Sequence, residues 1–203
     1  MGSSAVIDDI RALQNAGLAS LAFFYFDFRE DQKKDQRGIL SSLLVQLGEQ
    51  SDAYSAKLSS FYEAHRRGSQ HAGDNELLGC LKDMFNHPEQ AAIYIIIDAL
   101  DECPKTADLS HPREKVLNVI KELVDLKISN LRICVTSRRE ADIASILGPL
   151  AFRTVSLEDE GGQDEDIAEY VRNFVNTDSE MRDWKDADKE MVIDVLSKKA
   201  NGM

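Results

Sequence analysis

The amino-acid sequence predicts an α/β protein in which a mostly parallel sheet lies between two layers of helices. Two observations carry this prediction. Short apolar runs rich in β-branched and aromatic residues recur along the chain, and segments with apolar residues at helical spacing separate them. Strands that alternate with helices in this way form sheets covered on both faces, a three-layer sandwich.

The central strand is expected at Ile93 to Ile97, an uninterrupted apolar run that is too short to span a membrane. Three further buried strands are expected at residues 18–28, 131–136 and 152–157. Helices are expected at residues 5–16, 39–47, 54–62, 77–85, 114–127, 141–147, 164–175 and 187–200.

Length and charge limit the possible functions. The 203 residues, 43% of them hydrophobic, suffice for one domain with a substantial core. The net charge of -12, without a basic stripe, argues against nucleic-acid binding. The acids concentrate between Glu158 and Glu190, which predicts a solvated helix face, with a partner surface as the alternative. No apolar stretch reaches the roughly 20 residues of a membrane span, and no signal peptide occurs, so a soluble cytoplasmic protein is expected.

The cysteines and histidines do not suggest a metal site. Cys80, Cys103 and Cys134 are widely spaced in apolar contexts, which predicts reduced core thiols and not a disulfide framework. No two of the four histidines have metal-ligand spacing, so each is expected to be exposed to solvent.

Three acids follow the central strand. Asp98 comes directly after it, and Asp101 and Glu102 follow within one turn. Ligands of open α/β sheets collect beyond the carboxyl ends of the strands. A carboxylate at that place commonly holds a phosphate-bound Mg²⁺, the Walker B arrangement. The alternative is that Asp98 only caps the chain after a core strand, and the two further acids favour the Walker B interpretation.

An arginine follows the neighbouring strand. Arg138 comes two residues after the expected strand end, where its guanidinium could contact a terminal phosphate held beside Asp98. An exposed or ion-paired arginine at a helix start explains the same spacing equally well.

Four segments together resemble the NACHT domain of signal-transduction NTPases, and most of all the fungal branch of NOD-like proteins: LAFFYFDFRE, YIIIDALDEC, LRICVTSR and LSKKANGM. The resemblance implies a partial NACHT domain over residues 1–203, with residues 158–203 as an acidic, helical C-terminal part. It further implies that Asp98 acts on Mg²⁺ through water, that Asp101 and Glu102 are additional catalytic acids, and that Arg138 is the sensor-1 arginine that reports the γ-phosphate.

The fold implied by the resemblance is the P-loop NTPase sheet, with strand order 2-3-4-1-5, in which the four expected strands are strands 2, 3, 4 and 5. The phosphate-binding loop is missing, because no Gly-Lys pair occurs in the 203 residues. The chain is therefore expected to begin partway along the helix that follows that loop. Without strand 1, residues 131–136 would have an unpaired edge. We expect either that residues 152–157 close this gap or that the chain dimerises or aggregates through it.

The function implied is a nucleotide-switch and oligomerisation module of a fungal signalling or defence protein, with protein partners or further copies of itself. The resemblance implies Mg²⁺ and ATP or ADP as the ligands of the family, but the nucleotide site of this chain is incomplete, so the alternative is that it binds neither. One alternative is a nucleotide-independent module that regulates full-length relatives. Another is an active NTPase with a loop supplied by a partner chain, against which the missing lysine argues most strongly. Ala99, where many hydrolases place a glutamate, suits a slow ATPase- or GTPase-type switch.

Overall fold

The computed structural model describes residues 2–30, 35–68, 70–87, 91–105, 111–156, 163–179, 181–182 and 184–199. The chain divides into two compact units, Met1–Ala151 and Phe152–Met203. The sheet and all four predicted site residues lie in the first unit.

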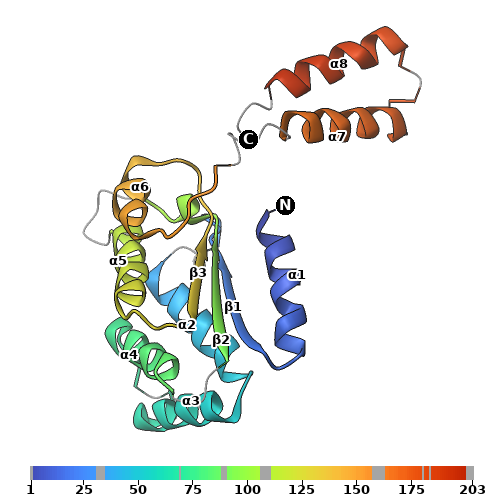
Figure 1. The fold of residues 1–203 in the computed structure, drawn as a ribbon. Helices are drawn as coiled ribbons and strands as arrows, with labels where there is room; N and C mark the ends of the chain where they lie inside the picture. Colours follow the sequence, from blue (N-terminus) through green and yellow to red (C-terminus); the bar gives the residue numbers. More distant parts are fainter. Residues whose placement is uncertain are drawn as a thin grey trace. The chain divides into compact units, whose positions relative to one another are not determined.

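The sheet consists of the strands β1 (Ala19–Tyr25), β2 (Ala92–Asp98) and β3 (Leu131–Val135). All pairs are parallel, in the order β1-β2-β3 (Figure 1). The register sets Phe23 beside Ile96, and Ile96 beside Cys134. The α/β class and the parallel sheet are confirmed, with strand ends that differ by up to three residues from the expected ones.

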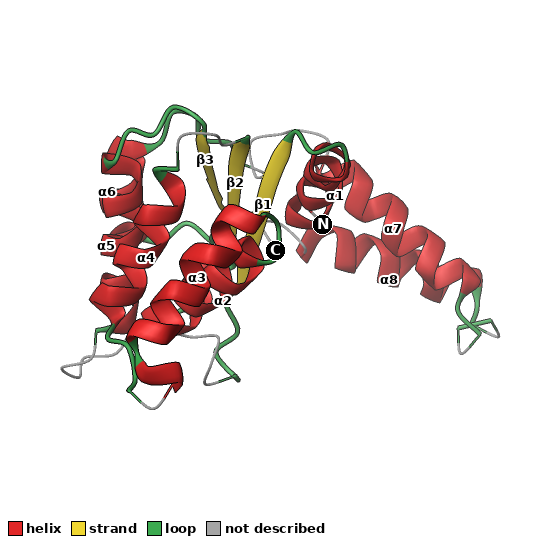
Figure 2. Cartoon of the chain, turned by 90° about the horizontal axis from the view of Figure 1, so that it is seen from below, coloured by secondary structure: helices red, strands yellow, loops and turns green. Residues whose placement is uncertain are grey.

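The α-helices of the first unit are α1 (Gly2–Asn15), α2 (Gln36–Gly48), α3 (Asp52–Ala64), α4 (Asp74–Phe85), α5 (Pro112–Asp125) and α6 (Ala141–Leu147). Short 3₁₀ turns are η2 (Arg66–Gly68), η3 (Leu100–Glu102) and η4 (Gly148–Leu150). Helix α1 covers one face of the sheet, and α2, α4 and α5 cover the other (Figures 1 and 2). This is the helix–sheet–helix layering that the sequence predicts.

Local side chains fix where the helices begin. The Asp35 carboxylate accepts a hydrogen bond from the N–H of Gly38 (2.8 Å) and caps α2. The Ser51 hydroxyl accepts one from the N–H of Tyr54 (3.1 Å) and caps α3. Both side chains satisfy amide groups that have no partner inside the helix.

The main hydrophobic core lies between the sheet and the helices α2, α4 and α5. Ile93, Ile95 and Ile97 of β2 are fully buried there, together with Leu43 of α2 and Leu81 of α4. Every second residue of a strand points to the same face, so β2 delivers all three isoleucines to this core.

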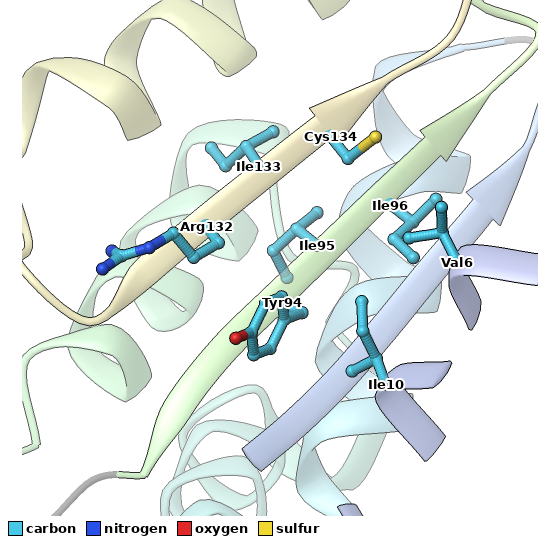
Figure 3. Close-up of a pocket in the computed structure, with 8 residues that line it drawn as sticks. All are labelled: Val6, Ile10, Tyr94, Ile95, Ile96, Arg132, Ile133 and Cys134. Carbon is cyan, nitrogen blue, oxygen red and sulfur yellow. The ribbon is translucent and has the colours of Figure 1, made fainter. Parts of the chain in front are cut away.

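The face toward α1 is covered only in part. Ile7 and Ile10 of α1 pack with Leu21 of β1 and Ile96 of β2 in a small apolar cluster. On β3, which α1 leaves uncovered, the side chains of this face are exposed. A groove of about 270 Å³ runs between α1 and β3 (Figure 3). Its lining includes Val6, Ile10, Tyr94, Ile96, Arg132 and Cys134.

The outer edge of β1 is closed by two glutamine side chains, that of Gln46 in α2 and that of Gln50 in the turn just after α2. The Gln50 amide accepts a hydrogen bond from the N–H of Leu21 (2.9 Å) and donates one to the Leu21 carbonyl (2.5 Å). The Gln46 amide does the same with Phe23, at 3.0 and 2.7 Å. A primary amide offers one acceptor and two donors, so each glutamine takes the place of a residue in a neighbouring strand.

The expected fourth strand is wrong. Residues 152–156 form no strand, and residue 157 lies outside the described residues. No described strand therefore pairs with the outer side of β3. The expected burial of all three cysteines is also wrong, because Cys80 and Cys103 are buried whereas Cys134 is exposed on the uncovered face of β3.

The second unit contains α7 (Gln163–Thr177) and α8 (Asp186–Lys199), which pack against each other. Tyr170 and Phe174 stack on α7 with ring centroids 6.4 Å apart. Across the described part of the chain, no helix has the length and apolar character that crossing a membrane requires.

Candidate functional site

The residues that follow the three strands are held side by side at one edge of the sheet. Asp98 is the last residue of β2, and its carbonyl accepts a hydrogen bond from the N–H of Phe26, just beyond β1 (3.1 Å). The N–H of Thr136, just beyond β3, donates to the carbonyl of Ile97 (2.9 Å). The carboxyl ends of parallel strands are where α/β proteins bind their ligands.

The Asp98 carboxylate is partly buried and hydrogen-bonded. The Thr136 hydroxyl donates to its Oδ1, and the same hydroxyl oxygen accepts from the N–H of Ala99 (3.1 Å). Burial is the larger cause that raises the pKa of Tyr25 and of Cys134, and the charge of Asp98 raises both further. Asp98 thus places a negative charge between β1 and β3, which suits a bound cation.

The chain turns sharply after Asp98. Ala99 has a φ of +54°, a left-handed conformation that costs a residue with a Cβ roughly 1–2 kcal/mol. The turn brings the fully buried Leu100 under the sheet, where its N–H donates to the carbonyl of Thr136 (3.0 Å). This turn carries Asp101 away from Asp98 and toward the segment that follows β3.

Asp101 connects to Arg138. Its Oδ1 accepts a hydrogen bond from the backbone N–H of Arg138 (3.0 Å), and its Oδ2 lies 3.5 Å from Nε of the same arginine. The Asp101 side chain is 11% exposed, whereas that of Arg138 is 85% exposed. The carboxylate therefore tethers the backbone of the segment after β3, while most of the guanidinium remains open to solvent.

Glu102 lies within electrostatic reach of the loop after β1. A hydrogen bond from Arg29 to Asp27 is the main cause that raises the pKa of Arg29, and the charge of Glu102 adds a smaller part. Asp101 and Glu102, although adjacent in η3, thus act on different neighbouring loops.

Arg113 contacts both loops of the site, the one after β2 and the one after β3, through its buried side chain. Among the described residues it is the one charged residue that is buried. Its Nε donates to the carbonyl of Cys103 (2.8 Å), and its Nη2 donates to the carbonyl of Asp101. Its Nη1 donates to Glu140 and lies 3.4 Å from Oδ2 of Asp142, the residues at the start of α6.

The Asp142 carboxylate is shared between two cations. Lys105 Nζ lies 3.4 Å from its Oδ2, in addition to the contact with Arg113. Burial alone would raise the pKa of Asp142, but hydrogen bonds and the charges of Lys105 and Arg113 outweigh it and lower the pKa. The carboxylate is thus held ionised beside Arg113.

The structure brings Asp98, Asp101 and Arg138 to one edge of the sheet. Thr136 and Arg113 are functional residues that the sequence patterns did not predict. Thr136 ends the third predicted strand, where a hydroxyl beside an acid is a usable signal. Arg113 comes three residues before the inward-facing Val116 of α5, so helical periodicity already placed it on the buried face.

The donor set at Asp98 fits a magnesium ion bound together with a phosphate. Within the described ranges, no group of three or more His, Cys, Asp or Glu side chains could hold a metal ion by itself. Mg²⁺ usually keeps several waters and takes one or two carboxylates plus substrate phosphates. One carboxylate beside the Thr136 hydroxyl matches that pattern, so any metal here would need a phosphate to complete its shell.

Two hollows in the first unit lie away from this edge. The groove of Figure 3 and a hollow of about 510 Å³ between α2 and α3 contain none of the four predicted site residues. Neither hollow therefore belongs to the candidate site, which is formed by the loops at the strand ends.

The fold and this edge define an α/β protein with an open parallel sheet and an acid-and-arginine cluster at its carboxyl end. Residues 1–138 match the family model described as Nephrocystin 3, N-terminal. The match covers more than half of the chain, which therefore belongs to this family. No curated protein and no solved structure matches the chain.

Proposed function

We propose that the chain is a nucleotide-switch module of NACHT type, with a P-loop NTPase fold, from a cytoplasmic signalling or defence protein of a fungus. The supporting observation is the arrangement at the carboxyl edge, where Asp98, bonded to Thr136, ends the central strand and the exposed Arg138 follows the next one. Membership of the Nephrocystin 3 N-terminal family is compatible with this proposal.

The roles divide between the two strand ends. Asp98 holds Mg²⁺ through a water molecule, and the ion offsets negative charge on the nucleotide phosphates. Arg138 contacts the terminal phosphate, for which its planar guanidinium is well shaped. Asp101 and Glu102 are the additional acids, and the contact of Asp101 with Arg138 keeps this arginine at the site.

The phosphate-binding loop has to come from residues beyond this sequence or from a partner chain, because the 203 residues contain no Gly-Lys pair. Its backbone N–H groups and lysine supply most of the contacts to the phosphates. Ala99 in place of a glutamate favours slow turnover, as expected of a switch.

Calorimetric titration with ATP and with ADP, each with and without Mg²⁺, tests the proposal. We expect Mg²⁺-dependent binding that is weaker than that of a site with its phosphate-binding loop and that Asp98→Ala weakens further, by at least about tenfold, or about 1.4 kcal/mol. Arg138→Ala should weaken ATP more than ADP, because only ATP presents the terminal phosphate. Matched controls are Asp52→Ala on α3 and Arg139→Ala, both exposed, which should bind like the wild type. Absence of heat at millimolar nucleotide, or unchanged affinity in Asp98→Ala, would contradict the proposal.

The second candidate is a nucleotide-independent interaction module. The observation that favours it is the outer side of β3, with which no described strand pairs and which adjoins the groove of Figure 3. Under this function, wild type and Asp98→Ala would both bind a protein partner without nucleotide. That outcome, together with no heat of nucleotide binding in the calorimetric titration, would favour the second candidate over the first.

A further inference from the structure

The loops that carry the candidate site are joined by several contacts, and Arg113 makes some of them. We infer that Arg113 is a positioning residue that fixes Arg138 relative to the loop after Asp98. The positioning stands on the contacts alone, and only its consequence for nucleotide binding rests on the proposed function.

Arg113 donates hydrogen bonds to both loops of the site. Two of its hydrogen bonds go to carbonyls of the loop after β2, those of Asp101 and Cys103. Its other contacts go to Glu140 and Asp142, which belong to the segment after β3 and the first turn of α6. One side chain therefore spans both loops.

These contacts, together with those of Asp101, hold the segment after β3 at two of its residues. Arg138 is tied to Asp101 through its backbone N–H, and Glu140, two residues later, is tied to Arg113. Arg113 in turn holds the carbonyl of the same Asp101. The segment from Arg138 to Glu140 is thus fastened to the Asp101 loop at both ends, which leaves little freedom for its backbone.

The shape of the guanidinium explains why this position needs an arginine. The Arg113 side chain is 7% exposed, and its contacts lie in several directions around one plane. A guanidinium presents five donors in a rigid fork, whereas a lysine ammonium is a compact charge with three donors. Lysine would keep the buried positive charge that Glu140 and Asp142 balance, but it could not reach both loops.

Amide hydrogen exchange of Arg113→Lys tests the inference. The reporter is the N–H of Arg138, which Asp101 protects, and the reference is a set of amides of α2 in the main core, such as that of Leu43. We expect exchange at Arg138 to accelerate at least tenfold while the α2 amides change less than threefold. Arg132→Lys is the matched control, because Arg132 is an exposed arginine of β3 that donates to the nearby carbonyls of Ser129 and Leu131.

Glu140→Gln is a second variant for the case in which Arg113→Lys does not fold. It keeps the shape of the side chain and leaves Arg113 in place but weakens the contact to the segment after β3. We expect a smaller acceleration at Arg138, again without a change in α2. Acceleration at all amides alike, or at none, in whichever variants fold would overturn the positioning role.

Titration of the same variants with Mg²⁺ and ATP separates this inference from the proposed function. If the wild type binds, Arg113→Lys should weaken ATP binding in the same direction as Arg138→Ala. If the wild type does not bind while exchange at Arg138 still accelerates, the positioning role stands and the proposed function fails.

Discussion

The two outer strands of the sheet, β1 and β3, differ in how the outward-facing peptide groups of their edges are covered. At β1, Gln46 and Gln50 pair with the backbone of Phe23 and Leu21, so this edge is satisfied from within the chain. At β3, the N–H of Thr136 and the carbonyl of Asn130 face β2, so the two-residue repeat turns the peptide groups of Ile133 and Val135 outward. No described strand meets them there.

This difference indicates which edge of the sheet can pair with a strand of another chain. Unpaired strand edges attract further strands, and proteins usually block them. The β1 edge is blocked by the side-chain amides of Gln46 in α2 and Gln50 in the turn after it, whereas the β3 edge has Arg132 as its charged residue and an apolar groove beside it. Association should therefore occur at β3 and not at β1.

The largest effect is expected from opening the closed edge. Replacing Gln46 and Gln50 by alanine removes four hydrogen bonds to β1, at roughly 0.5–1.5 kcal/mol each, so the free energy of unfolding should fall by about 2–6 kcal/mol. Urea denaturation measures this difference. Gln70→Ala, an exposed glutamine, should stay within about 0.5 kcal/mol of the wild type. An equally small effect of the double variant would mean that the two amides do not close the edge.

A proline scan of β3 tests the open edge. Ile133→Pro removes an outward-facing N–H, so it should lower the self-association of the chain at least about fivefold, or about 1 kcal/mol, measured by sedimentation. Cys134→Pro removes an N–H that faces β2, so it should destabilise the fold more than Ile133→Pro does, although Cys134 is exposed. If Ile133→Pro associates like the wild type, β3 is not the contact.

The smallest effect is expected for the alkylation of two thiols, those of the exposed Cys134 and the buried Cys103. Although Cys134 is exposed at the surface, the neighbouring protein atoms partly desolvate its thiol, and this desolvation first and the charge of Asp98 second raise its pKa. Alkylation by iodoacetamide needs the thiolate, so its rate at Cys134 should be lower than that of an ordinary thiol at pH 8 and should increase as the pH rises beyond 9. Asp98→Asn should accelerate it at pH 8. Burial raises the pKa of Cys103 to about 12, so this thiol should remain unmodified throughout. Mass spectrometry of the labelled chain distinguishes the two sites.

Sequence patterns predicted the three strands because each is an apolar run that ends in polar residues. They failed at residues 152–156, because a strand also needs a partner, and pairing is not encoded in an alternating pattern alone. They failed for Cys134, because apolar neighbours along a strand do not reveal whether a helix covers that face. The expected exposure of histidines failed at His65, whose side chain is 14% exposed and contacts the Phe61 carbonyl and Glu76.

The candidate site was predictable in position but not in connectivity. Asp98 and Arg138 follow strands, and that alone places them at one edge. The pairing of Asp101 with the backbone of Arg138 depends on the left-handed turn at Ala99, which no residue type announces, since glycine is the usual choice there. The role of Arg113 depends on where two loops meet in space.

The glutamine pair on β1 also shows how two different periodicities can be matched. Four residues of a helix advance about 6.0 Å and two residues of a strand about 6.6 Å, so glutamines one turn apart face every second peptide group of an adjacent strand. Because Gln50 meets Leu21 and Gln46 meets Phe23, the helix runs opposite to the strand. The mismatch of about 0.6 Å per step accumulates, so only two or three such amides can stay aligned. In protein design, the same pair of glutamines could cover the edge of a short strand, but a long strand would need a different means of covering its edge.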